Sequence, residues 1–96
     1  MEIPQDVRTF IEGSFPQEEW GEAILVLRNA RIEDGTTPSP RLLRCVAVAS
    51  HGNMQWLEHF ASLLAIDWRD VIMAGEYEFD DKVPVQVRDL TQPLQI

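Results

Sequence analysis

The stretch SPRLLRCVAVA, residues 39–49, decides the fold. It begins with a serine, whose hydroxyl can cap free amides, and a proline, which suits the first turn of a helix. The residues that follow are apolar on nearly every side of a helix, and only Arg41 and Arg44 define a polar edge. The stretch predicts a central, buried helix. A short buried strand over residues 45–48 is the alternative.

Helical patterns lie on both sides of this stretch. Apolar residues recur at intervals of three and four before it, and a turn-rich loop over residues 33–38 separates the two parts. After it, Asn53 and Asp67 can each cap a further helix. Helices are predicted over about 4–12, 17–31, 40–49, 54–64 and 67–77. The sequence therefore predicts an all-α fold, a compact bundle of about five short helices.

The last part of the chain, residues 76–96, has a weaker pattern. Tyr77 and Phe79 alternate with acidic residues, and three valines alternate with other residues, which leaves open a short hairpin turning at residues 80–82. Pro84 argues against a central strand. We expect an extended C-terminal arm, which either packs across its own domain or reaches a neighbouring chain.

Length and composition limit the domain organisation. A chain of 96 residues supports one core, so we expect a helical domain over residues 1–79 and an arm over residues 80–96 within the same single domain. The only cysteine, Cys45, excludes an intramolecular disulfide, and no signal-peptide pattern opens the sequence. These features predict a cytoplasmic protein.

The charge balance restricts the partners. Sixteen acidic residues and eight basic ones give a formal net charge of −8, which repels phosphate backbones and anionic membranes. No apolar stretch approaches the roughly 18 residues that are needed to cross a bilayer. We therefore expect a protein partner, with basic character, and neither nucleic acid nor a membrane.

No catalytic or metal-binding pattern is visible. Cys45 lies inside the apolar run, where a core position is expected and not a nucleophile. His51 and His59 lie on different elements, and the residue four before His59 is Gln55, a poor zinc ligand. Glycine-rich phosphate loops and serine elbows are absent from the sequence. The sequence predicts a protein that is not an enzyme and has no cofactor or metal.

Two groups of residues are candidates for binding. Arg41 and Arg44 form either ion pairs with acids of a neighbouring helix or an anion-binding site. Other residues, at the border of the fourth helix and in an acidic cluster near the arm, are candidates for contact with a partner, although such clusters are also typical of a solvated face. These partner-binding candidates are Trp56, His59, Leu63, Glu76, Glu78, Asp80 and Asp81.

We expect a small acidic intracellular protein-interaction domain, which acts as an adaptor, inhibitor or regulatory subunit. One alternative is a small-ligand-binding protein or enzyme that uses side chains converging on a cleft, namely Arg41, Arg44, His51 and His59. Another is a self-associating structural protein, a homo-oligomer in which Leu25, Val26 or the valine-rich arm packs against a second copy.

Overall fold

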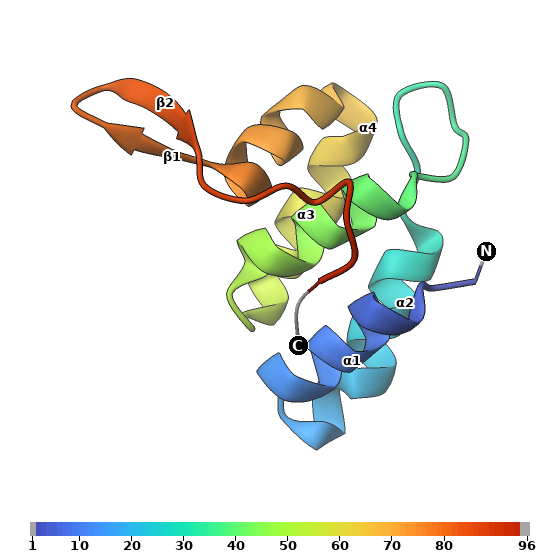
Figure 1. Cartoon of the computed structure of the whole chain (residues 1–96). Coiled ribbons are helices and arrows are strands. Elements are labelled where there is room, and N and C mark those ends of the chain that lie inside the picture. The colour runs from blue at the N-terminus through green and yellow to red at the C-terminus, as the bar shows by residue number, and fades with distance from the viewer. Residues whose placement is uncertain (1, 95–96) are drawn as a thin grey trace.

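The predicted central helix is confirmed. In the computed structural model, which describes residues 2–94, α3 (Pro40–Ser50) crosses the middle of the molecule (Figure 1). The hydroxyl of Ser39 accepts a hydrogen bond from the N–H of Leu42 at 3.4 Å, and the proline occupies the first turn, as the sequence predicts. Nearly every side chain of α3 is buried, including that of Arg44.

The turn after α3 brings two distant parts of the chain together. His51 (φ 51°) and Gly52 (φ 75°) both have left-handed backbone conformations, which end the helix. A Cβ at Gly52 would collide with the backbone carbonyl of Ser14, so this position requires glycine for space as well as for conformation. The side chain of Asn53 then accepts the N–H of Trp56 at 3.0 Å and begins the next helix.

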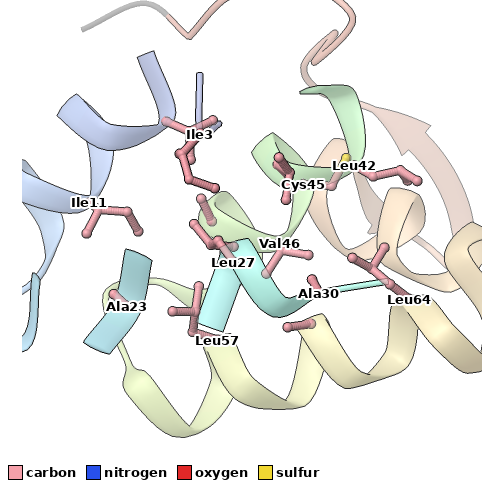
Figure 2. Packing of buried hydrophobic residues seen from close by; sticks show 14 of the residues in the cluster. Ile3, Ile11, Ala23, Leu27, Ala30, Leu42, Cys45, Val46, Leu57 and Leu64 are labelled. Carbon is pink, nitrogen blue, oxygen red and sulfur yellow. The ribbon is translucent and has the colours of Figure 1, made fainter. Parts of the chain in front are cut away.

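Two N-terminal helices pack against each other, the first also against α3 and the second also against the long helix that follows α3. They are α1 (Gln5–Ser14) and α2 (Trp20–Asn29), with a short 3₁₀ turn, η1 (Gln17–Glu19), between them. Their periodic apolar residues point inward and join one core, which confirms the predicted helical stripes. Figure 2 shows Leu27 of α2 close to Val46 of α3 in this core.

The fourth and fifth predicted helices form one element, so the prediction of five helices is wrong by one. α4 (Met54–Glu76) is bent at Asp67, whose backbone (φ −155°, ψ 96°) is not helical. The side chain of Asp67 accepts the N–H of Arg69 at 3.1 Å, as an N-cap does. A single residue therefore restarts the helix in a new direction, and no loop separates the two halves.

The C-terminal segment is a hairpin followed by a packed tail, which corrects the expectation of an arm that is extended throughout. β1 (Tyr77–Asp80) pairs antiparallel with β2 (Val83–Gln86), and Figure 1 shows the hairpin projecting from the helices. The pairs are Tyr77 with Gln86, Glu78 with Val85, Phe79 with Pro84 and Asp80 with Val83. Asp81 (φ 49°) and Lys82 (φ 69°) make the two-residue turn. The proline is tolerated because a two-stranded sheet has no central strand.

The turn offers a direct test of the hairpin. Positive φ values at both turn positions are typical of a type I′ turn, which prefers asparagine followed by glycine. We expect Lys82→Gly to stabilise the hairpin by about 1 kcal/mol, because glycine adopts a positive φ without the strain of a side chain. Slower hydrogen exchange of the Val83 amide would report this. Faster exchange would contradict the turn geometry.

After the hairpin, the chain returns across α3 toward α1 (Figure 1). Leu90 is buried in the core, whereas the three valines of the hairpin and its exit are exposed. The tail therefore packs across its own domain through Leu90 and not through the valines. Residues 95–96 of the predicted arm lie outside the described residues. Within residues 2–94, the structure contains no helix whose length and apolar character would let it span a bilayer.

Candidate functional site

The hairpin is attached to the helices by a buried carboxylate. Glu76, the last residue of α4, has no exposed side-chain surface. Arg41 of α3 donates two hydrogen bonds to it, at 2.7 and 2.8 Å. The side-chain amide of Gln86 donates at 3.0 Å and the backbone N–H of Leu90 at 3.3 Å. We call these four residues the hairpin anchor. They join α3, α4, β2 and the tail.

The anchor keeps its carboxylate ionised. The hydrogen bonds from Arg41 lower the pKa of Glu76 below its usual range, although burial acts in the opposite direction. Cys45 lies beside it, with its sulfur 3.8 Å from a carboxylate oxygen, and burial raises the pKa of this thiol to about 12. The thiol therefore stays protonated at neutral pH, in agreement with its predicted core position.

Backbone hydrogen bonds strengthen the same junction. The carbonyl of Glu76 accepts the N–H groups of Val87 at 2.8 Å and of Arg88 at 3.3 Å. The guanidinium of Arg88 donates to the carbonyl of Gly75 at 2.7 Å. Carbonyls at the end of α4, which a helix leaves without internal partners, are thus satisfied by Val87 and Arg88, the two residues that follow β2. The base of the hairpin is held firmly on both strands.

A second ion pair holds the tail against α1. Arg44 donates to Asp6 at 2.7 Å and to the carbonyl of Leu90 at 3.2 Å, and the N–H of Leu94 donates to Asp6 at 3.0 Å. Burial by itself raises the pKa of Asp6, but the bonds from Arg44 and Leu94 and the charge of Arg44 together lower it. This ion pair and the hydrogen bonds around it join α1, α3 and the tail, which are far apart in the sequence.

Both arginines of the predicted anion site are therefore paired with carboxylates. Arg41 binds Glu76 and Arg44 binds Asp6, so the ion pairs considered from the sequence are present. The side chain of Arg41 is still 36% exposed and lines a cavity of about 450 Å³, whereas His51 lines a different cavity of about 220 Å³. These two members of the predicted cleft do not converge.

The acidic cluster divides into two parts. Glu76 is buried in the anchor and does not belong to an exposed acidic face, which corrects its proposed contact with a partner. Glu78, Asp80 and Asp81 are exposed on the hairpin. Among residues 2–94, no three His, Cys, Asp or Glu side chains are grouped so that they could hold a metal ion.

The hairpin also carries large exposed apolar side chains. Phe79 is 71% exposed, Val83 59% and Val85 44%. Residues that face each other across a strand pair share a side of the sheet. One side of the hairpin therefore carries the acids Glu78 and Asp80 beside the two valines, and the other side carries the aromatic ring of Phe79. Apolar and acidic groups thus alternate on a projecting element.

A second exposed group lies on the first half of α4. Trp56 and His59 are exposed, and Leu63 is partly buried. The ring of Trp56 contacts the rings of His59 and Phe60, with centroids 5.6 and 5.8 Å apart. The predicted border of this helix is therefore a surface aromatic cluster.

Sequence reasoning missed two residues of this site, Asp6 and Gln86, and placed Leu90 only among the apolar residues through which the arm packs across its own domain. One signal was present for Glu76, which lies four residues after Ile72 and so continues the apolar stripe of its helix. Leu90 shares the tail with other aliphatic residues, such as Val87 and Leu94, so its residue type alone does not single it out. Comparison of the chain with models of known families, with characterised proteins and with solved structures finds no match.

Proposed function

We propose that the chain is a small protein-interaction domain whose C-terminal hairpin binds a basic partner. The observation that carries this proposal is the exposure of Phe79, Val83 and Val85 on an element that projects from the helices. Neighbouring exposed apolar side chains, such as Val83 and Val85 on one side of this hairpin, are typical of a contact surface. The proposed role is that of an adaptor, inhibitor or regulatory subunit, without catalysis.

The anchor supports the proposal because it gives the hairpin a fixed position. An isolated two-stranded hairpin is only marginally stable in water. Here, both strands are attached to the helices through Glu76, by the bond from Gln86 and by the backbone bonds from the residues after β2. A partner therefore meets a preorganised surface, which lowers the entropic cost of binding.

Charge supports a basic partner. Glu78, Asp80 and Asp81 are exposed on the hairpin, and the chain as a whole has a formal net charge of −8. Such a field attracts positively charged proteins and accelerates their association at low salt. A cytoplasmic setting belongs to the same proposal, because the single Cys45 is a buried free thiol.

Photo-crosslinking from the hairpin tests this function. A photoreactive phenylalanine analogue replaces Phe79 in one protein and Leu25 in a matched control, since Leu25 is also exposed (56%) but lies on α2. In lysate of the source cells, we expect a crosslinked basic protein from position 79 at roughly 0.05 M salt, and much less at roughly 0.5 M salt. Equal crosslinking from position 25 would contradict the proposal.

Charge reversal provides the second arm of this test. Reversal of Glu78, Asp80 and Asp81 to lysine should abolish crosslinking from position 79, because the attraction becomes repulsion. A control protein carries the same three charge changes on the N-terminal helices, where exposed acids are also available. The control changes are Glu12→Lys, Glu18→Lys and Glu22→Lys. Equal loss in both proteins would show that net charge, and not the hairpin, selects the partner.

A further inference from the structure

The two outer edges of the hairpin differ in the backbone N–H and carbonyl groups that could bind an added strand. In an antiparallel pair, hydrogen-bonded residue pairs alternate with pairs that are not hydrogen-bonded. The N–H of Val87 donates to the carbonyl of Glu76, and these residues continue the register of β1 and β2. The alternation therefore points the backbone groups of Glu78 and Asp80 toward β2, and those of Tyr77 and Phe79 toward the outer edge of β1.

The outer edge of β2 is blocked, whereas that of β1 is open. Pro84 faces outward from β2, and it has no N–H to donate to an added strand. On β1, the N–H and carbonyl of Phe79 and the carbonyl of Tyr77 face outward. The sheet has two strands in the described part of the chain, so neither edge is paired there. Strand addition is therefore favoured at β1 alone.

Side chains on β1 specify the chemistry of an added strand. Glu78 and Asp80 point to one side of the sheet and Phe79 to the other. A strand beside β1 would place alternate side chains next to the two acids, where lysine or arginine forms favourable cross-strand pairs. Its other side chains would lie beside the aromatic ring, where apolar residues are favoured.

A second copy of this chain fits the edge poorly. Antiparallel pairing of two β1 strands about Phe79 would place Glu78 of each copy opposite Asp80 of the other. Directly opposed like charges destabilise a sheet, and each copy has a formal net charge of −8. Charge therefore selects a basic strand from another protein.

We infer that the outer edge of β1 binds an extended segment of the partner as a third strand, antiparallel to β1, with basic and apolar residues in alternation. This inference rests on the proposed function and adds how the partner is recognised. Backbone hydrogen bonds at Phe79 provide affinity, and alternate side chains provide specificity, as in other cases of strand addition.

Synthetic peptides test the inference without knowledge of the partner. The probe is a heptapeptide of alternating lysine and valine, titrated into the whole chain and followed by amide NMR. We expect saturable binding, with slower hydrogen exchange at the Phe79 amide and no slowing at Gln86 on the other edge. A peptide of the same composition with all lysines first, and an alternating glutamate and valine peptide, should bind at least about tenfold more weakly.

Methylation of the peptide backbone distinguishes strand addition from simple charge attraction. In a third strand antiparallel to β1, with its lysines beside Glu78 and Asp80, the valine N–H groups face β1 and the lysine N–H groups face away. Methylation of the valine nitrogens should therefore weaken binding about tenfold or more, whereas methylation of the lysine nitrogens should change it by less than about threefold. Equal effects of the two methylations would overturn the inference.

A variant of the chain gives the reciprocal test. Phe79→Pro removes the outward N–H but no hydrogen bond between β1 and β2, and Phe79→Ala removes the ring alone. We expect weaker peptide binding by Phe79→Pro than by Phe79→Ala, provided that cross-strand contacts between Glu78 and Val85 persist in the NMR spectra. Equal binding by the two variants would overturn the inference. If Phe79→Pro loses these contacts, the variant is not used. The inference is then tested by the binding of the two methylated peptides to the wild-type chain.

The outcomes separate the inference from the proposed function. If position 79 crosslinks a basic protein but no alternating peptide protects the Phe79 amide, strand addition is overturned and the interaction function stands. If the glutamate peptide binds as well as the lysine peptide, both are overturned. If the chain forms a concentration-dependent dimer in which the Phe79 amide is protected, the occupant of the β1 edge is a second copy and not a basic segment. This result would overturn the inference.

Discussion

Arg41→Met should lower the free energy of unfolding by about 3 kcal/mol, because it leaves the Glu76 carboxylate buried without its counter-ion. This is a large part of the roughly 5–15 kcal/mol expected for a domain of this size. Urea denaturation at pH 7, followed by tryptophan fluorescence, measures the change. Hydrogen exchange at the Val87 amide should also accelerate, because the base of the hairpin loosens.

A matched variant separates this effect from the general loss of an arginine. Arg69 forms an exposed ion pair with Asp67 at 3.2 Å, and we expect Arg69→Met to cost no more than about 1 kcal/mol. The double variant Arg41→Met, Glu76→Gln should recover much of the loss, since it removes the buried charge. Equal costs for Arg41→Met and Arg69→Met would contradict the role of the anchor.

Acid pH changes the stability in a defined direction. The pKa of Glu76 is lowered in the folded protein, so the unfolded chain binds a proton first as the pH falls past about 4.3. The contribution of Glu76 is therefore present above that pH and is lost as the pH falls through the folded-state pKa. In Arg41→Met, burial without a counter-ion raises this pKa, so the destabilisation by the mutation should shrink toward low pH. A constant difference between pH 7 and pH 4 would contradict this.

The elements that the sequence predicts well are those whose signals are local. Ser39 and Asn53 act as caps where their positions suggest, and the apolar run between them is the buried helix. Asp67 also caps, but capping geometry alone does not reveal whether a loop precedes the new helix. The fourth and fifth predicted helices are therefore one bent helix.

The candidate site depends on contacts that local patterns do not encode. Arg41 meets Glu76 across 35 positions, and Arg44 meets Asp6 across 38. The sequence indicates that the two arginines need acidic partners, but sixteen acidic residues are available. The alternation in residues 77–87 permits a hairpin, but Pro84 argues against a central strand, and the sequence does not show that the sheet has only two strands in the described part of the chain. The stability of the hairpin comes from the anchor, a tertiary feature.

Gly75→Ala should lower the free energy of unfolding by about 2–3 kcal/mol, although alanine is the better helix former. A Cβ at Gly75 would lie 2.7 Å from both the Cα and the Cβ of Cys45, because α4 crosses α3 there without room for a side chain. Backbone must therefore move, and the adjacent Glu76 would be displaced from Arg41. We expect the loss to appear in urea denaturation, together with faster exchange at the Val87 amide.

Two controls make the Gly75 result specific. Gly21 lies in α2 with open space around its Cα, so Gly21→Ala should stabilise the chain by about 0.5–1 kcal/mol through helix propensity. Adding Cys45→Ala to Gly75→Ala should not restore stability, because it removes only the sulfur, 3.0 Å away, and leaves the two carbons at 2.7 Å. If Gly75→Ala is tolerated as well as Gly21→Ala, then α3 and α4 are further apart at Cys45 and Gly75 than the structure shows. If Cys45→Ala rescues it, the obstacle is the flexible thiol, and the anchor does not depend on backbone contact between α3 and α4.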